Sequence, residues 1–397
     1  MMEGNIRAIG LDKVEESLRL SQFAFQYELS EAELAERIAS FKPGLSWGYY
    51  IEDQLAAKLI ILKLQTWING RSFDMGGIAS VATWPEFRRH GMVKKLLIHA
   101  LQTMKEAGQT VSFLHPFEFP FYRKYGWETY IEHKKYEIPK DLIIKQFTSL
   151  GQMKQTNDWK LLDPIYQAYA QQFNGTLIRD EAWWTKNRGN KSAAFAIYYD
   201  ESNVAKGYIQ YKVKNKEMNV DELVFLDESA RRGLWKFIAD HDSMMEKVIV
   251  KAPIDDQLAF LLTNPRIKQE IVPYFMARIV DLVAFIEKLP MTTGLEKQKL
   301  ELQITDSFAP WNNGTFAVKW NTSGKAKVKQ VEASLTKETK GSPSILACDI
   351  GTLSAMLLGY QRPTLLKTIG RLQATNEAVE ILEQLIPRNT TYLMDFF

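Results

Sequence analysis

The sequence predicts an α/β (α+β) protein with two similar domains in tandem and a third, small α+β domain. Three observations support this prediction. Short apolar runs alternate with amphipathic helical patterns, the order of these patterns repeats about 148 positions later, and the composition changes at Pro290–Gly294. The length of 397 residues fits two or three domains. We expect the domains to cover residues 1–145, 146–288 and 289–397.

A strand, a tight turn and a helix form the centre of the first domain. Ile78–Thr83 is short and apolar, and Pro85 ends it because proline cannot donate to a sheet ladder. A helix begins near Gly91, since apolar residues then recur at intervals of three and four. These apolar residues are Met92, Val93, Leu96, Leu97, Ala100, Leu101 and Met104.

The other elements of the first domain follow from period and turn signals. Asp12 is expected to cap a helix that runs toward Tyr27. The domain is expected to end near Pro139. Its further strands are expected at Ile6–Ile9, Ser46–Glu52, Ala56–Leu64 and Val111–Leu114.

The turn before the Gly91 helix has the features of an anion site. Arg88, Arg89, His90 and Gly91 place successive backbone N–H groups and two guanidinium groups where the helix begins. The unpaired N–H groups and the helix dipole favour a phosphate, and a glycine allows close approach of its oxygens. A pyrophosphate fits best. The alternative is a solvated arginine pair, but the order of strand, turn and helix favours the anion site.

Two motifs carry a resemblance to a known family. Val81–Gly91 (VATWPEFRRHG) fits V-x-x-x-P-x-x-R-x-x-G and resembles the acetyl-CoA pyrophosphate loop of the GNAT superfamily of N-acetyltransferases. Val93 replaces the usual third small residue, and the Eis (enhanced intracellular survival) acetyltransferases also have a larger residue there. Phe121–Trp127 (FYRKYGW) resembles the second GNAT signature. The chain is therefore similar to Eis acetyltransferases.

The resemblance implies acetyl-CoA as co-substrate and no metal. The backbone at Val81 and Thr83 would hold the pantetheine and thioester like an added strand, and an N–H group there would polarise the carbonyl. The pyrophosphate would lie on the turn. The full set of expected acetyl-CoA contacts is Val81, Ala82, Thr83, Arg88, Arg89, His90, Gly91 and Met92.

The second domain reads as a degenerate copy of the first GNAT fold. Phe195–Val213 repeats the strand, acidic turn and strand of Trp47–Gln65. Arg231-Arg232-Gly233, followed by a helical pattern, echoes the cofactor turn with one residue fewer. Nothing after Pro253 matches FYRKYGW. We therefore expect the first copy to be active and the second not to bind acetyl-CoA. The alternative is that any two α/β domains share this order of elements.

The third domain resembles the sterol carrier protein fold that ends the Eis proteins. Asp349 precedes an apolar helical run and Gly359 follows it, as a cap and a stop would. We interpret this domain as structural. Its strands are expected at Leu302–Ile304, Thr315–Trp320 and Ala326–Ala333.

Composition argues against several classes of function. Lys plus Arg total 50 against 47 Asp plus Glu, so a net charge of +3 argues against a nucleic-acid binder. The single cysteine, Cys348, excludes an internal disulfide. The five histidines lack metal-ligand spacing, and HExxH, GxSxG and CxxC are absent. Without an apolar leader or a run of ~18 apolar residues, we expect a cytoplasmic protein and no membrane partner.

Tyr122 is the expected general acid, because the CoA thiolate needs a proton when it leaves and a phenol can supply it. The alternative is a core tyrosine among aromatic neighbours, and Tyr125 is the competing assignment. Gly126 fixes the alignment of FYRKYGW in favour of Tyr122. His115, which follows the Val111 strand, is a weaker candidate for a base.

The chain end carries the expected general base. Phe396 and Phe397 would be costly to leave in water, so we expect Thr391–Phe397 to be docked. The resemblance to Eis proteins implies that the Phe397 carboxylate reaches the catalytic cavity of the first domain and accepts the amine proton. The alternative is that both rings close the core of the third domain.

The expected function is direct transfer of acetyl from acetyl-CoA to a primary amine of a cationic acceptor, either an aminoglycoside-like small molecule or a lysine side chain of a peptide. Glu28 could attract such an amine, although a solvated surface carboxylate is the simpler interpretation. The resemblance also implies a homo-oligomer, a hexamer. The rival interpretation is a non-catalytic regulatory protein that binds acyl-CoA or lipid.

Overall fold

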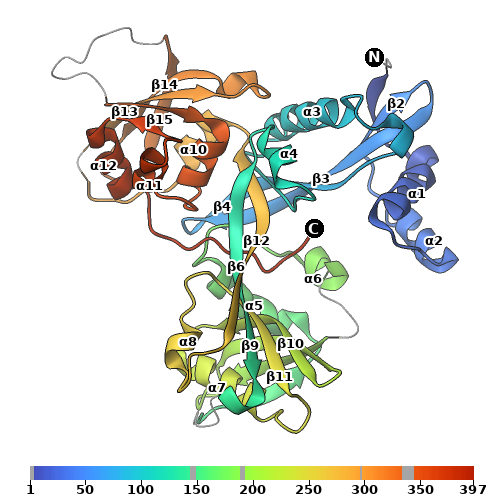
Figure 1. Ribbon diagram of the computed structural model, residues 1–397, viewed down its shortest axis with the longest axis vertical. Helices are drawn as coiled ribbons and strands as arrows, with labels where there is room; N and C mark the ends of the chain where they lie inside the picture. The colour runs from blue at the N-terminus through green and yellow to red at the C-terminus, as the bar shows by residue number, and fades with distance from the viewer. Residues whose placement is uncertain (1–3, 144–148, 188–192, 296, 333–343) are drawn as a thin grey trace.

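The computed structural model describes residues 4–143, 149–187, 193–295, 297–332 and 344–397. Within these residues the strands form two sheets. Twelve strands make one sheet in the order β1-β2-β3-β4-β5-β12-β6-β11-β10-β9-β8-β7, and five make the other in the order β15-β14-β13-β16-β17. Figure 1 shows three lobes: the N-terminal half, the C-terminal domain beside it and the second half below. The chain end returns from the third lobe to the junction of the first two (Figure 1).

The elements of the two halves follow one another in the same order. The first half contains β1 (Asn5–Ala8), α1 (Val14–Phe25), α2 (Glu31–Ala39), β2 (Ser46–Ile51), β3 (Gln54–Ile68), β4 (Arg71–Thr83), α3 (Met92–Glu106), β5 (Val111–Leu114), α4 (Phe119–Arg123) and β6 (Glu128–Pro139). The second half contains β7 (Gln152–Thr156), α5 (Trp159–Ala170), α6 (Glu181–Asn187), β8 (Ala194–Tyr199), β9 (Ala205–Lys214), β10 (Glu217–Phe225), α7 (Glu228–Ala239), β11 (Lys247–Ala252), α8 (Leu258–Leu261) and β12 (Lys268–Ile279).

The two halves exchange their last strands. β12, from the second half, lies between β5 and β6 of the first half, and β6 pairs on its other side with β11. Each half therefore needs a strand of the other to complete its part of the sheet. The expected boundaries at residues 145 and 288 do not describe this exchange, and they remain a prediction.

The hairpin of β3 and β4 is longer than the sequence pattern suggested. Asn69 and Gly70 both have positive φ, at 49° and 70°, and join the strands through a tight turn. Such a turn matches the twist of the two strands it connects. Pairing consequently extends from Ile68↔Arg71 to Ala57↔Thr83. This Asn-Gly pair is a sequence signal for the longer hairpin, which the expected strand ends did not include.

The predicted cap of the first helix is wrong. Residues Leu11–Lys13 form a 3-10 turn, and the N-cap of α1 is Lys13, which makes no side-chain capping bond. Asp12 therefore lies one residue too early to reach the free N–H groups of the helix. The helix also ends at Phe25, because Gln26 adopts a left-handed conformation with φ 54°.

The third domain has the predicted strands, with somewhat different ends. The Asp349 cap is confirmed, since its carboxylate accepts from Thr352 N at 2.8 Å, and Gly359 follows the helix with φ 88°. Residue 333 lies outside the described residues. The elements are α9 (Leu282–Lys288), β13 (Gln298–Thr305), β14 (Gly314–Trp320), β15 (Ala326–Val331), β16 (Ser344–Asp349), α10 (Ile350–Leu357), α11 (Pro363–Thr368), β17 (Gln373–Ala374) and α12 (Asn376–Leu385).

A buried arginine joins the third domain to the first. Arg278 of β12 is 0 % exposed, forms an ion pair with Asp306 and donates to the carbonyl of Tyr125. Its guanidinium also lies over the Trp127 ring, 5.2 Å from the centroid. Gly126, with φ 85°, leaves no room for a Cβ beside this guanidinium. The network fixes the backbone that follows α4.

Candidate active site

The strands β4 and β5 part at the centre of the first half. They pair in parallel from Met75↔Val111 to Ile78↔Leu114, after which β5 ends and β4 continues. Just beyond this point β4 contains a β-bulge. Ala79 of β4 pairs with Ile60 of β3, and Ala82 pairs with Lys58, so β4 advances three residues where β3 advances two.

Ser80 and Val81 therefore oppose a single residue of β3, and Ser80 has φ 51°. The edge of β4 beyond Ile78 no longer pairs with β5. An extended ligand can add to that edge as a further strand would.

A cleft of about 710 Å³ opens along this end of β4. It is bounded by α1, by the turn that leads into α3, and by the loop and helix around α4. Its lining residues are Ala24, Phe25, Val81, Ala82, Thr83, Phe87, Arg88, Arg89, Gly91, Met92, Val93, Lys94, Phe117, Phe121 and Tyr125.

The N-terminus of α3 meets the cleft without a side-chain cap. Gly91 is the N-cap residue, with φ 78°, and no atom lies within 4 Å of where its Cβ would be. Arg88 and Arg89 are exposed, and neither forms an ion pair within the described residues. Uncapped N–H groups, the helix dipole and two unpaired guanidinium groups make this turn suitable for a pyrophosphate.

The cleft brings together the expected acetyl-CoA contacts except His90. Val81, Ala82, Thr83, Arg88, Arg89, Gly91 and Met92 all line it, whereas His90 is exposed and lies outside the lining.

Several lining residues were not expected from the sequence, and some of them come from other elements of the first half. Ala24 and Phe25 come from α1, Phe117 from the loop after β5, and Lys94 from the first turn of α3. Phe25 and Phe117 are apolar but 51 % and 68 % exposed, which is typical of residues that line a ligand site. This exposure is visible only in the structure.

Tyr122 lies directly behind the wall of the cleft. It is 2 % exposed, and its ring contacts Phe117 at 5.3 Å and Phe121 at 5.1 Å between centroids. Burial raises the pKa of Tyr122 well above its usual value, so the phenol keeps its proton at neutral pH. Tyr125, the competing candidate, lines the cleft itself, and burial raises its pKa as well.

The C-terminal tail runs across the second half before it returns to the first. Its backbone pairs with Asn174, which donates to Thr390 O and accepts from Tyr392 N, both at 2.9 Å. Tyr392 and Leu393 are buried, at 3 % and 2 % exposure. The predicted docking of the tail is confirmed for this part.

Asp395 anchors the tail in a buried ion network. Its carboxylate accepts from Arg179 Nε at 3.0 Å, Trp183 Nε1 at 2.8 Å and Tyr166 OH at 3.2 Å. Arg179 also pairs with Glu222 at 2.5 Å, and all three charged side chains are 0 % exposed. The second half therefore holds the tail two residues before its end.

The last two residues differ in burial. Phe396 is 62 % exposed, so the expectation that both terminal rings leave water is wrong for Phe396, whose ring meets His115 at 5.0 Å and Phe275 at 6.3 Å. The Phe397 ring packs against Phe275, at 4.9 Å, and lies so close to Gly77 of β4 that a Cβ there would be 2.7 Å away. The chain thus ends against the sheet of the first half.

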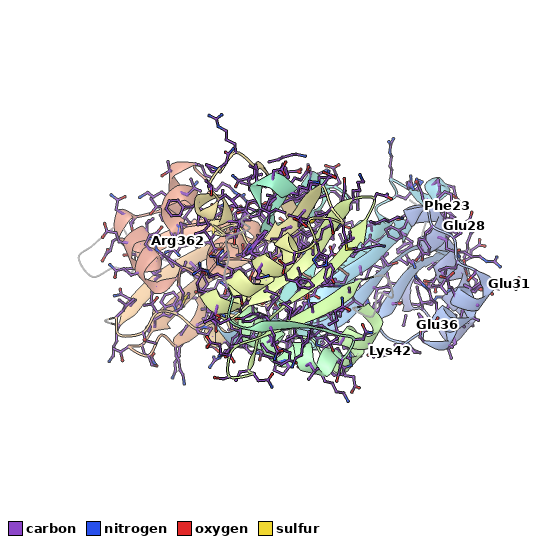
Figure 2. The ribbon with its side chains drawn as sticks, turned by 90° about the horizontal axis from the view of Figure 1, so that it is seen from below. Phe23, Glu28, Glu31, Glu36, Lys42 and Arg362 are labelled. Carbon is purple, nitrogen blue, oxygen red and sulfur yellow. The ribbon has the colours of Figure 1, made fainter. Side chains whose placement is uncertain are left out.

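The Phe397 ring contacts β4 at Gly77, before the bulge. Gly77 precedes Ser80 by three residues, or about 10 Å along a strand. By contrast, Glu28 is exposed and lies near Phe23, Glu31 and Glu36 at the end of the molecule formed by α1 and α2 (Figure 2).

His115 lies beside the tail rather than in the lining of the cleft. Its ring meets the edges of Tyr274, Phe275 and Phe396 at 5.0 to 5.5 Å. Burial lowers the pKa of His115, so the imidazole is largely neutral near pH 7.

The expected echo of the cofactor turn in the second half is wrong. Arg231, Arg232 and Gly233 lie inside α7, which begins at Glu228 directly after its cap, Asp227. Arg231 is paired with Glu228 at 2.7 Å. The chain has no loop at this place because β10 passes into the helix through two residues.

The described part of the chain contains no group of three or more His, Cys, Asp and Glu side chains placed to hold a metal ion. Within the same residues, no helix has both the length and the apolar character needed to cross a bilayer.

Comparison with known proteins agrees with this architecture. The family model of the acetyltransferase (GNAT) domain matches residues 5–131, a second GNAT model matches residues 175–279, and a sterol carrier protein domain model matches residues 282–394.

Characterised and uncharacterised relatives match over most of the chain. An uncharacterized N-acetyltransferase of Streptomyces avermitilis is 22% identical over 379 residues, covering 88% of this chain and 87% of that protein. N-acetyltransferase Eis of Mycobacterium tuberculosis is 23% identical over 320 residues, covering 75% and 74%.

Solved structures share the whole fold. A probable N-acyltransferase of Enterococcus faecalis superposes with a TM-score of 0.89 at 28% identity, covering 100% of both chains. Eis1 of Mycobacterium abscessus superposes with a TM-score of 0.81 at 19% identity, covering 99% of this chain and 100% of that one. The protein is thus an Eis-like N-acetyltransferase of the GNAT family, with tandem GNAT domains and a C-terminal sterol carrier protein-like domain.

Proposed function

We propose that the first half binds acetyl-CoA in the cleft and transfers its acetyl group directly to a primary amine of a cationic acceptor. The observation that carries this proposal is the uncapped N-terminus of α3, with Arg88 and Arg89 unpaired within the described residues, at the mouth of a cleft that begins where β4 and β5 part. A pyrophosphate on this turn directs the pantetheine along Thr83, Ala82 and Val81. His90 and Met92 complete the turn, Met92 through its backbone.

The thioester then lies at the bulge of β4. A backbone N–H group of Val81 polarises the carbonyl, and the amine attacks the carbonyl carbon. The C–N bond forms, the C–S bond breaks, and the CoA thiolate takes a proton from Tyr122. The Tyr122 phenol is protonated at neutral pH, since burial raises its pKa, and it can therefore donate when the thiolate forms.

The Phe397 carboxylate accepts the proton that the amine loses, directly or through water. The contact of the Phe397 ring with Gly77, three residues before Ser80, supports this assignment. The anchored Asp395 supports it further, because a tail held two residues earlier presents its end in a fixed place.

A cationic acceptor suits the exposed carboxylates at the end of the molecule formed by α1 and α2. Ala24 and Phe25 line the cleft, and the exposed carboxylates of Glu28, Glu31 and Glu36 follow on the same side of the molecule (Figure 2). An aminoglycoside-like amine or a lysine side chain of a peptide fits this setting. The second half binds no acetyl-CoA. We further propose a cytoplasmic homo-oligomer, a hexamer by its likeness to Eis proteins, without nucleic-acid or membrane partners.

Steady release of free CoA tests the function. Purified protein is incubated with acetyl-CoA and a panel that contains kanamycin, spermine and a lysine peptide, and the thiol is measured over time. Amine-dependent release is expected, and the ratio of rates on kanamycin and the peptide assigns the acceptor class. Acetyl-CoA binding without amine-dependent release at any pH would favour the non-catalytic regulatory protein instead.

A further inference from the structure

A buried lysine lies beneath the irregular part of β4. Lys58 of β3 is 1 % exposed and lies in register with Ala82, which lines the cleft. Its ammonium donates to Ser17 Oγ at 3.0 Å and to Ser21 Oγ at 2.5 Å, both on α1. Within the described residues no carboxylate pairs with it. Burial lowers the pKa of Lys58 to about 7, since an ammonium without a counter-ion is costly inside a protein.

Two hydroxyl groups connect Lys58 to the bulge. Ser21 Oγ lies 3.2 Å from Ser80 Oγ. An ammonium can only donate, so Ser21 accepts from Lys58, while in the bond between Ser21 and Ser80 either hydroxyl can be the donor. When Ser21 is the donor, the Ser80 proton is free to point away from this chain of hydroxyl groups.

The outer end of the chain lies beside the cleft. Ser21 precedes Ala24 and Phe25 by one turn of α1, so all three share a face of that helix. Ala24 and Phe25 line the cleft, and so does Val81, the residue after Ser80. Ser80 is not itself among the lining residues, but it shares the bulge with Val81, so its hydroxyl lies next to the lining with the positive charge of Lys58 behind it.

Other charged groups near Lys58 are engaged elsewhere. Its neighbours across the strands are Gly48 on β2 and Ala82 on β4, which do not titrate. On α1, Glu16 accepts from Leu55 N at 2.8 Å and lies 3.6 Å from the Lys13 ammonium. The cation is thus available to an anion that forms in the cleft.

We propose that charged Lys58, acting through Ser21 and Ser80, is a positioning residue that stabilises the negative charge developing on the acetyl carbonyl oxygen during transfer. The inference rests on the proposed function, which places the thioester at the bulge. When the amine attacks, the C–N bond forms and the carbonyl π electrons move onto oxygen. They return as the C–S bond breaks and CoA leaves. A donor fixed at the bulge lowers the energy of this oxyanion, and Lys58 keeps its proton throughout.

The test compares Lys58→Met with the wild type and with Lys63→Met, which changes an exposed lysine of the same strand. Methionine is unbranched and suits a buried site, so the variant should fold. With kanamycin and acetyl-CoA saturating near pH 6.5, kcat of Lys58→Met is expected to fall about tenfold. Acetyl-CoA affinity, by calorimetry, and KM for kanamycin should be unchanged. Lys63→Met should match the wild type.

The pH profile separates an electrostatic role from a packing role. Lys58 is charged below its pKa, so the charge disappears as pH rises through about 7. The ratio of wild-type to Lys58→Met kcat should therefore shrink between about pH 6 and pH 8.5. Taking the ratio cancels the titration of the amine itself.

Ser80→Ala gives a second route if Lys58→Met does not fold. Ser80 is half-buried, and its variant should lower kcat in the same direction without a change in melting temperature. Unchanged kcat in Ser80→Ala, or a ratio that stays constant with pH, would overturn the inference while the acetyltransferase stands. No acetyl-CoA binding or turnover by the wild type would instead overturn the proposed function, and the inference with it.

Discussion

The N-termini of α3 and α7 occupy corresponding places in the two halves but differ in what meets their first turn. Gly91 gives α3 no side-chain acceptor, and the neighbouring Arg88 forms no ion pair within the described residues. In α7 the Asp227 carboxylate accepts from Ala230 N at 2.9 Å, and Arg231 is paired with Glu228 at 2.7 Å. A carboxylate of the chain itself already stabilises the positive end of α7. A helix terminus remains a site for an external anion only where the chain leaves it uncapped.

The strands beside these helices show the same contrast. In the first half Ala82 faces Lys58 beyond the bulge, and the cleft remains open. In the second half β10 also bulges, and there Glu222 faces Gln210. Glu222 pairs with Arg179, which holds the C-terminal tail through Asp395. The bulge of the second half thus belongs to a buried ion network, whereas the bulge of the first half borders the open cleft.

The largest expected effect concerns the tail that links the two halves. Appending one glycine after Phe397 moves the carboxylate while leaving the Asp395 network intact. We expect kcat to fall by ~100-fold or more, because a displaced base loses its geometry. Melting temperature and acetyl-CoA affinity should change little. Full activity of the extended protein would exclude the Phe397 carboxylate as base and favour His115 or a bound water.

Tyr122→Phe tests whether the first half alone carries the acid chemistry. Turnover is expected to fall by ~100-fold, with acetyl-CoA affinity nearly unchanged, because the hydroxyl is needed only as the thiolate leaves. Steady-state kinetics and calorimetry on the same samples provide both values. Tyr125→Phe is the matched control, and loss of turnover in that variant alone would reassign the acid to Tyr125.

Arg88→Gln and Arg231→Gln compare the two helix termini directly. The first variant should weaken acetyl-CoA binding by about 1.5 to 3 kcal/mol, since it removes a charge-assisted contact to phosphate. The second should leave binding unchanged, because Arg231 lies within α7 and pairs with Glu228. Calorimetric titration gives both values. Equal losses would mean that the second half also contributes to binding.

The smallest effect is expected from uncapping the second helix. Asp227→Ala removes the acceptor for Ala230 N and should destabilise the protein by about 1 kcal/mol, measured by denaturant titration. It should not create acetyl-CoA binding, because β10 leads into α7 without a loop. Asp349→Ala, which uncaps α10 in the third domain, is the control for cap loss far from either half. New CoA binding in Asp227→Ala would show that the cap alone closes this site.

Local sequence predicted the strand, turn and helix at the centre of the first half and, with them, the cofactor turn of the cleft. The order of strand, turn and helix from Ile78 onward places backbone N–H groups, guanidiniums and glycine at one helix terminus, because neighbouring residues need no tertiary contact to share a turn. The Asp349 cap of α10 follows from the same short-range chemistry. The prediction that Arg231–Gly233 repeats the cofactor turn was wrong, because no loop precedes these residues and they lie inside α7.

Features that depend on contacts between distant parts of the chain were decided only by the tertiary structure. The placement of β12 between β5 and β6, the Arg179–Asp395 pair and the contact of Phe397 with Gly77 join residues far apart in sequence. Periodicity records which face of an element is buried, but it does not record which partner covers that face. For the same reason Lys58 looked like an ordinary lysine of a strand, and only its burial under the serines of α1 distinguishes it.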